Sequence, residues 1–341
     1  MRITIKDIAK DVGVSIMTVS RVMNNSGYVS KEARNKIEQA IKRMGYRPNL
    51  IARSLILKKS EFLHIVVPDI ANPFFAELIK GAERVASKYG YNVIVSETDW
   101  TEALEIEHLE GAIRRMVEGV ILVAPKLSLK EIIKFNKAIP LIIVDRPIKN
   151  KSISSVYIDN KQGAFTATAH LIDLGHTRIA FISGPMSIMN SVRRLKGYLA
   201  ALEAYGISVD KSLIYHGDFK YDSGRKIFDL ISNLPVKDRP TAVFASNDLM
   251  ALGLMQRALE AGWSIPGDLS ILGFDDILLS SLVTPPLTTV SHPYVKMGER
   301  AVTILLKILQ NNIDTGPFEK LKNVFIERKS TKALATHEEK Q

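Results

Sequence analysis

The sequence of 341 residues predicts an α/β protein that begins with a small all-helical unit. Before Gly45, apolar residues recur at helical spacing in short stretches separated by glycine turns. From Phe62 onward, short apolar runs typical of buried strands alternate with longer stretches typical of helices. The charge divides the chain similarly: residues 1–60 hold 13 Lys and Arg against 4 Asp and Glu, and the other residues hold 33 against 32. We therefore expect a basic helical unit followed by a nearly neutral α/β core.

The composition excludes several classes of protein. Hydrophobic residues make up 46% of the chain, which indicates a folded globular protein, and the length suffices for two or three domains. The absence of cysteine excludes disulfides, thiolate metal sites and a cysteine nucleophile. The N-terminus lacks the apolar core of a signal peptide, and no run reaches the roughly 18 apolar residues of a membrane span. We expect a cytoplasmic protein without a membrane partner.

The stretch from Thr4 to Asn25 predicts two short helices joined by a tight turn. Gly13 suits a turn position with positive φ, and Ser15 suits the N-cap of the second helix. The residues that the apolar stripe of this second helix leaves pointing outward are Ile16, Met17, Ser20 and Arg21. The pattern fits a helix-turn-helix, whose second helix enters the DNA major groove, but also an ordinary helical hairpin of a globular core. The local excess of basic residues, as phosphate neutralisation requires, favours DNA binding.

A third helix is expected to begin at Ser30 as its cap and to end at Gly45 and Pro48. Residues 1–48 would then form the helical unit, and residues 49–60 a linker.

The core is predicted to contain two series of strands and helices. Strands of the first series are expected at 63–68, 92–96, 120–124 and 140–144, with helices at 75–89, 102–116 and 129–137. Strands of the second are expected at 156–158, 178–183, 213–216, 241–245 and 270–274, with helices at 162–174, 191–205, 221–232 and 248–261. A helix at 294–310 and a strand at 324–326 follow. This alternation predicts parallel sheets in two similar subdomains within 61–330, and residues 331–341 form a polar tail.

Polar and aromatic side chains follow several predicted strands, where ligands bind in open α/β sheets. They include Asp69, Asn72, Phe74, Phe75, Asp145, Arg146, Phe219, Asn247 and Asp275, together with Arg194 on a helix. Each has an alternative explanation, since Asp after a strand is often a helix N-cap and Phe is usually core. For Asp248 and Asp276 we prefer the capping interpretation. Together the set has the chemistry of a sugar site, with groups that pair to vicinal hydroxyls and rings that cover apolar faces.

A longer motif runs through the N-terminal unit. It reads T-I-K-D-I-A and then G-V-S-x-x-T-V-S-R-V-x-N, and it is followed by Tyr46-Arg47-Pro48-Asn49 and Ala52-Arg53-Ser54-Leu55. This motif resembles the headpiece of the LacI/GalR bacterial repressors, and the resemblance continues across almost the whole chain. It implies a homodimeric repressor that binds a pseudo-palindromic operator.

The resemblance also implies roles for individual headpiece residues. The base-reading residues would be Ile16, Met17 and Arg21. Contacts to the DNA backbone, or roles in setting the register, would belong to Thr4, Thr18, Ser20, Asn25 and Tyr28. In the linker, Ala52, Arg53 and Leu55 would form a minor-groove hinge, with the leucine wedged between base pairs.

For the core, the resemblance implies a periplasmic-binding-protein-like fold with Rossmann-like, parallel-sheet subdomains. The chain would cross between them near Asp159, Ser291 and Gly316, so that one subdomain holds 61–159 and 292–316 and the other 160–291 and 317–330.

The candidate ligand set resembles that of the periplasmic ribose-binding protein. The effector-binding residues would be Asn72, Phe74, Phe75, Asp145, Arg146, Arg194, Phe219, Asn247 and Asp275, with weaker candidates Asp69, Asn190 and Ser291. Phe74 or Phe75 would sandwich the sugar ring with Phe219. The set favours a monosaccharide, and ribose or a similar pentose in particular. Ser291 departs from the pattern, since the ribose-binding protein has a longer amide there, and Ile188 and Met189 before Asn190 argue against a purine.

Other functions remain as alternatives. The chain lacks the common catalytic motifs and the carboxylate pair of a glycosidase, so we expect no enzyme activity, no cofactor and no metal. A sugar-binding transport receptor would fit the cleft but not the basic headpiece. A repressor that uses a purine or a phosphorylated carrier protein as corepressor is the remaining alternative. We expect the sugar to release the repressor from its operator, the usual outcome for catabolic sugars in the family.

Overall fold

The computed structural model describes residues 3–24, 26–46, 59–310 and 316–334. The chain divides into two compact units, Met1–Ser60 and Glu61–Gln341. Among the described residues, no helix is long and apolar enough to cross a membrane.

The first unit is a bundle of three helices, α1 (Ile5–Val12), α2 (Ile16–Met23) and α3 (Lys31–Met44). Ile8, Val19 and Ile37, one from each helix, are completely buried at its centre. The predicted caps are confirmed, since the Ser15 hydroxyl accepts from the Thr18 N–H at 3.0 Å and the Ser30 hydroxyl accepts from the Ala33 N–H at 3.3 Å. Gly13 and Gly45 adopt φ of 75° and 62° where α1 and α3 end.

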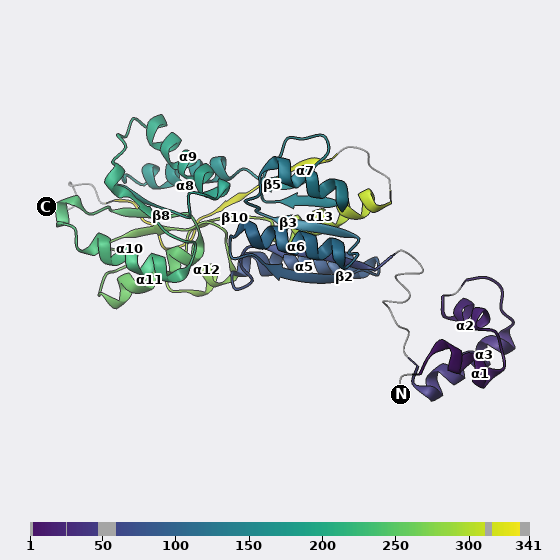
Figure 1. The fold of residues 1–341 in the computed structure, drawn as a ribbon. Coiled ribbons are helices and arrows are strands. Elements are labelled where there is room, and N and C mark those ends of the chain that lie inside the picture. Colours follow the sequence, from purple (N-terminus) through teal and green to yellow (C-terminus); the bar gives the residue numbers. More distant parts are fainter. Residues whose placement is uncertain (1–2, 25, 47–58, 311–315, 335–341) are drawn as a thin grey trace. The chain divides into compact units, whose positions relative to one another are not determined.

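The second unit has two lobes, whose sheets lie side by side with β10 between them (Figure 1). The sheet of the first lobe is parallel and has the strand order β11-β5-β4-β3-β1-β2. Its strands are β1 (Phe62–Val67), β2 (Asn92–Glu97), β3 (Gly119–Val123), β4 (Leu141–Val144), β5 (Ser154–Ile158) and β11 (Phe318–Leu321). Its helices are α5 (Pro73–Lys88), α6 (Glu102–Arg114), α7 (Leu129–Ala138) and α13 (Tyr294–Leu309).

The sheet of the second lobe is also parallel, with the order β7-β6-β8-β9. Its strands are β6 (Ile179–Ser183), β7 (Ile214–His216), β8 (Ala242–Ala245) and β9 (Ser270–Leu272). Its helices are α8 (Asn160–Asp173), α9 (Met189–Ala204), α10 (Tyr221–Ser232), α11 (Asp248–Glu260) and α12 (Leu278–Leu282), with short 3-10 helices η1 (Lys211–Leu213) and η2 (Val236–Asp238). A small antiparallel pair, β10 (Thr289–Ser291) and β12 (Val324–Ile326), completes the unit.

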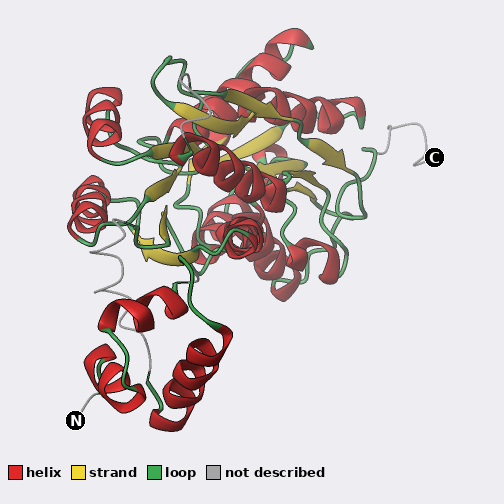
Figure 2. Cartoon of the chain, turned by 90° about the vertical axis from the view of Figure 1, so that its right-hand side faces the viewer, coloured by secondary structure: helices red, strands yellow, loops and turns green. Residues whose placement is uncertain are grey.

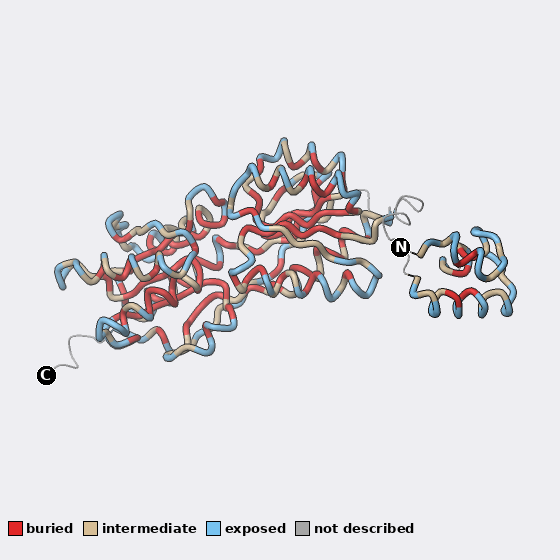
Figure 3. Tube along the Cα trace, turned by 60° about the horizontal axis from the view of Figure 1, so that its bottom comes forward, coloured by how far each residue is buried: buried red, intermediate tan, exposed pale blue. Residues whose placement is uncertain are grey.

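Helices enclose both sheets (Figure 2), so the central strands are buried on both faces. Every residue of β3, β4, β6 and β8 is buried. In Figure 3 the buried parts of the trace lie in the interior of the two lobes and the exposed parts on their outside. This burial explains why these strands are continuous apolar runs without a polar alternation. The predicted α/β class is confirmed.

Two placements differ from the predicted arrangement. The strand at 156–158, counted in the second series, belongs to the first sheet as part of β5, which pairs with β4; the subdomain bounds that the resemblance implied, 61–159, do include it. The third crossing between the lobes follows Leu321 and does not lie near Gly316, because β11 pairs with β5 in the first sheet. The sequence of β11, F-E-K-L, is polar and mostly not buried, so no apolar run marked it as a strand.

The beginning of the predicted polar tail is attached to the second lobe. The Leu334 N–H donates to the Leu174 carbonyl at 2.8 Å, and a ring nitrogen of His176 lies 3.0 Å from the Lys332 carbonyl. The next residues, 335–341, are outside the described part of the chain.

Candidate functional site

The second helix of the first unit presents apolar side chains to solvent. Ile16 and Met17 at its start are 44% and 64% exposed, and Tyr28 in the following loop is 88% exposed. Arg21, also exposed, lies over Gly27, because a Cβ at Gly27 would be 3.4 Å from the arginine Cδ. Exposed apolar residues beside an arginine, in a unit with an excess of basic residues, are suited to reading base edges and thymine methyl groups.

Two of the hydroxyls predicted to contact the DNA backbone have partners at the starts of α1 and α2. The Thr18 hydroxyl lies 2.8 Å from that of Ser15. The Thr4 N–H and hydroxyl both donate to the Asp7 carboxylate, at 2.8 and 2.7 Å. These contacts hold the first turns of α1 and α2 in place. The predicted residues that lie outside the described part of the chain are Asn25, Ala52, Arg53 and Leu55.

A pocket lies between the two lobes of the second unit. The space between its lining side chains, counted out into open solvent, is about 340 Å³. The first lobe contributes residues after β1, β2 and β4, and the second contributes the start of α9 and residues after β7, β8 and β9, so the pocket lies at the carboxyl ends of parallel strands. The lining residues are Asn72, Phe74, Phe75, Trp100, Asp145, Ile188, Asn190, Arg194, Phe219, Asn247 and Asp275.

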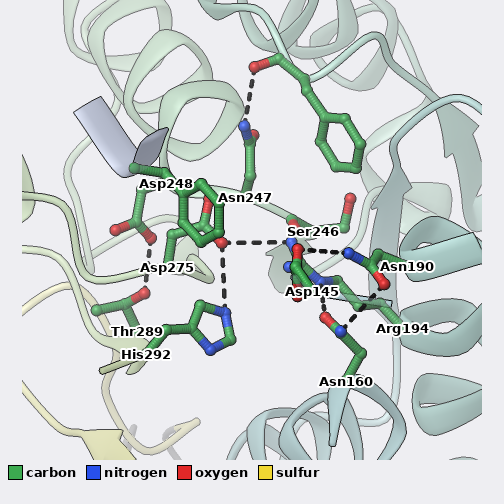
Figure 4. Close-up of polar contacts among 12 residues, drawn as sticks. Asp145, Asn160, Asn190, Arg194, Ser246, Asn247, Asp248, Asp275, Thr289 and His292 are labelled. Atoms are coloured by element: carbon green, nitrogen blue, oxygen red, sulfur yellow. Dashed lines mark hydrogen bonds and ion pairs between the residues drawn. The ribbon is translucent and has the colours of Figure 1, made fainter. Parts of the chain in front are cut away.

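Arg194 of α9 is the buried cation of this pocket (Figure 4). One guanidinium nitrogen lies 3.4 Å from the Asp275 carboxylate and also donates to the Ser246 carbonyl, while Nε donates to the Asn160 side-chain oxygen at 2.7 Å. The guanidinium carbon lies 3.9 Å from the centre of the Phe274 ring. These contacts orient the arginine before any ligand arrives.

Asp145, at the end of β4, joins the first lobe to the second. Its carboxylate accepts from the Asn190 side-chain amide at 2.6 Å, and Asn190 in turn accepts from Asn160 at 3.2 Å. Burial raises the pKa of Asp145 to about 7, opposed chiefly by the charge of Arg194. Burial likewise raises the pKa of Asp275 to about 7, again opposed by Arg194. The pocket therefore holds two carboxyl groups that titrate near neutral pH around one guanidinium.

Aromatic rings form the apolar walls. Phe74 and Phe75, at the start of α5, pack edge to face with ring centres 4.6 Å apart. Phe219 faces them from the second lobe, and its ring occupies space above Gly184, where a Cβ would be 2.2 Å from a ring carbon. Asn247 fixes the Phe219 backbone, because its amide donates to the Phe219 carbonyl at 2.8 Å.

Three predicted effector contacts lie outside the pocket lining. The Arg146 guanidinium points away and donates to the carbonyls of Pro125 and Leu127, at 2.9 and 2.6 Å. Asp69 accepts from the Ala71 N–H at 2.8 Å and stabilises a turn. Ser291 pairs with β12 as part of β10. The strand-end rule, that ligands bind at the carboxyl ends of parallel strands, does not consider nearby main-chain groups. In all three cases such groups hold the residue away from the pocket.

The capping interpretation of Asp248 and Asp276 is wrong. Asn247 caps α11, accepting from the Met250 N–H at 3.0 Å. The buried Asp248 carboxylate instead accepts from the Ile277 N–H at 2.9 Å and from the hydroxyls of Ser280 and Thr289, each at 2.6 Å. Asp276 forms an ion pair with Arg328 at 2.5 Å.

The structure adds site residues that the sequence did not identify. Trp100 follows β2 at its carboxyl end, so the strand-end rule would have found it if it had been applied to that strand. Ile188 lines the pocket but carries no polar signal. His292, next to the predicted Ser291, lies behind the pocket lining and also contacts Asp275, with Nε2 3.4 Å from the carboxylate; burial holds its pKa well below the usual value. Among the described residues, no group of three or more His, Asp or Glu could hold a metal ion.

A basic helical unit with an exposed recognition surface, followed by a two-lobed unit with a pocket for one small polar molecule, defines a DNA-binding regulator with a ligand-binding domain. Residues 4–49 match the family model for bacterial regulatory proteins of the lacI family. Residues 168–331 match the model of the periplasmic binding protein-like domain. The chain belongs to the lacI family of bacterial regulatory proteins, as the headpiece motif predicted.

The similarity to characterised proteins extends over nearly the whole chain. The chain is 37% identical to catabolite control protein A of Priestia megaterium, over 97% of this chain and 100% of the relative. It is 38% identical to the ribose operon repressor of Halalkalibacterium halodurans, over 96% and 97%. The lac repressor dimer bound to operator and an anti-inducer matches with a TM-score of 0.85 at 29% identity, over 98% and 100%.

Proposed function

We propose that the protein is a transcriptional repressor that binds a pseudo-palindromic operator as a homodimer and is released by a monosaccharide, with ribose or a similar pentose favoured. The observation that carries this proposal is the buried Asp145–Arg194–Asp275 group between aromatic walls. Because the proposed repressor acts on DNA, we also propose that it is located in the cytoplasm.

The pocket chemistry supports a sugar ligand. Vicinal hydroxyls donate to carboxylates and accept from a guanidinium, and charged partners strengthen these bonds. Phe75 and Phe219 provide apolar faces from opposite lobes, as a sugar ring requires. The similarity to a ribose operon repressor supports a pentose within this class.

An apolar surface on the second lobe supports the homodimer. On the short helix α12, Leu278 and Leu282 are 72% and 67% exposed, and Leu279 beside them is also exposed. Exposed leucines grouped on one short helix are unusual for a surface that stays in water. We assign a second copy of the chain to this surface, since a similar chain has been solved as a dimer on its operator.

Calorimetric titration with ribose, other pentoses, glucose, galactose, hypoxanthine and guanine tests the effector. We expect a pentose to bind most tightly and to release the protein from operator DNA in a gel-shift assay. Binding of a purine, or of no compound in the panel, would contradict the sugar proposal.

Arg21→Ala is expected to weaken operator binding by about 1–3 kcal/mol, which is roughly 5- to 150-fold, because an arginine can bond to both N7 and O6 of one guanine. Fluorescence anisotropy with labelled operator measures this loss, and sugar affinity should be unchanged. Arg43→Ala is the matched control, because it removes the same charge from a side chain that pairs with Asp11. An equal loss in both variants, or a parallel loss of sugar binding by Arg21→Ala, would contradict the base-reading role.

A further inference from the structure

Two loops, one from each lobe, meet over the pocket. The loop after β2 carries Asp99 and Trp100, and the loop after β7 carries Phe219 and Lys220. The ring centres of Trp100 and Phe219 are 5.8 Å apart, with 37° between their planes. The Lys220 ammonium lies 3.5 Å from the Asp99 carboxylate. We call these four residues the interlobe clasp.

The clasp residues have an unusual backbone. Asp99, Trp100 and Phe219 adopt φ of 42°, 57° and 67°, in the left-handed region that residues other than glycine rarely enter. Specific bonds hold them there, since the Thr101 hydroxyl donates to the Asp99 carbonyl at 3.2 Å and Asn247 donates to the Phe219 carbonyl at 2.8 Å. Such backbone outliers cluster at ligand clamps and switch regions. The two loops of the clasp therefore have the backbone features of a ligand clamp.

Trp100 has a special position in the pocket lining. The other lining residues, at most 8% exposed, are all buried, whereas Trp100 is only partly buried. Trp100 therefore lies at the boundary between pocket and solvent. Its ring also lies 6.1 Å from that of Phe75, so it spans from the wall of its own lobe to Phe219 of the other.

The aromatic contact closes the clasp more effectively than the ion pair does. The side chains of Lys220 and Asp99 are 56% and 67% exposed, and exposed pairs of this kind contribute little to stability. The Phe219 ring is firmly placed above Gly184. Trp100, the less buried of the two rings, thus forms the outer half of the closure, and its indole ring bounds the space beneath it.

We propose that Trp100 is a specificity-determining residue that limits the effector to a single ring. This inference rests on the proposed sugar-binding function. A polyhydroxylated monosaccharide fits beneath the indole ring while Trp100 keeps its contact with Phe219. A ligand extended by a second ring must displace Trp100 and lose that contact, so the clasp selects against glycosides, nucleosides and disaccharides.

The test compares single-ring and extended ligands in the full-length protein and its variants. Calorimetry measures the dissociation constants of D-ribose and cytidine, in which the same sugar carries a base, and of D-glucose and cellobiose. The quantity of interest is the ratio of the extended to the single-ring constant in whichever pair binds. We expect the wild type to prefer the single ring by at least 100-fold. Trp100→Ala should reduce this ratio at least tenfold, and Trp100→Phe should give an intermediate ratio.

Trp263→Phe is the matched control, because this tryptophan packs against Phe228, with ring centres 5.2 Å apart, and does not line the pocket; it should change the ratio by less than threefold. Operator binding and thermal unfolding establish that each variant is folded, and Trp100→Phe serves if Trp100→Ala does not fold. A ratio unchanged by both tryptophan substitutions, or a wild type that binds extended ligands as well as single rings, would overturn the clasp proposal and leave the sugar proposal intact. If only another sugar of the calorimetric panel binds, that sugar and its phenyl glycoside form the test pair; a wild type that binds no sugar of the panel would overturn both proposals.

Discussion

Replacing Arg194 with methionine is expected to lower the free energy of unfolding of the two-lobed unit by about 3–5 kcal/mol at pH 8. This is the expected cost of removing one partner of a buried ion pair, because the remaining charge stays buried without compensation. Asp275 would lose its guanidinium partner, and Asp145 would lose the nearby positive charge that stabilises its ionised form. The side-chain oxygen of Asn160 would lose a donor as well.

The loss of unfolding free energy in the Arg194→Met variant should depend on pH. Burial raises the pKa of Asp145 and of Asp275 to about 7, and Arg194 is the main influence that lowers both. A carboxyl whose pKa is raised by folding favours the folded state below its unfolded pKa near 4, and this contribution is lost as the pH rises through the folded pKa. Without Arg194 both pKa values rise further, so the penalty falls mainly at high pH. We expect the deficit to be largest above pH 7 and to shrink toward pH 5.

Thermal and denaturant unfolding of wild type and variant at pH 5 and pH 8 measure this effect. Arg193→Met is the matched control, because Arg193 precedes Arg194 on α9, is only partly buried and does not line the pocket. It should cost less than about 1 kcal/mol at either pH. A deficit for Arg194→Met that is equal at both values of pH would contradict the assignment of Arg194 as counter-ion of these carboxyls.

Asp275→Ala is expected to weaken binding of the effector sugar by about 2–3 kcal/mol, which is roughly 30- to 150-fold, while operator affinity stays unchanged. In the proposed site the carboxylate accepts from sugar hydroxyls, and it also contacts Arg194, at 3.4 Å. Its removal therefore costs hydrogen bonds to the ligand and the orientation of a second group that binds it. The variant should occupy its operator and no longer be released by the sugar at wild-type concentrations.

Calorimetry with the sugar identified by the panel and anisotropy with operator DNA measure the two affinities separately. Asp276→Ala is the control, because Asp276 is the next residue and pairs with Arg328 outside the pocket lining. It should retain the wild-type response. If the Asp275→Ala variant were still released by the same sugar concentration, the assignment of the pocket as the effector site would be wrong.

Local features of this protein could be predicted from the sequence because their causes are local. The Ser15 and Ser30 caps bond to groups only three residues away, and a turn at Gly13 needs only its own φ. The alternation of apolar runs and amphipathic stretches predicted the α/β class, since burial on both faces removes polar residues from a strand. The strand-end rule identified Asn72, Asp145 and Asp275, because the carboxyl ends of parallel strands meet at one edge.

Only the tertiary structure decided which candidates reach the pocket. Arg146 turns to main-chain carbonyls 19 and 21 residues away, and Asp248 accepts from groups 29, 32 and 41 residues away that α12 and β10 bring to it. β11 joins the first sheet despite its polar sequence, because β5 presents an edge that needs hydrogen-bond partners. Each polar side chain forms its bonds with whichever groups folding brings near it, and many of these come from distant parts of the sequence. The sequence by itself therefore determined which polar and aromatic side chains are available, and that they gather at the carboxyl ends of the parallel strands. Packing between distant segments decided which of these side chains line the pocket.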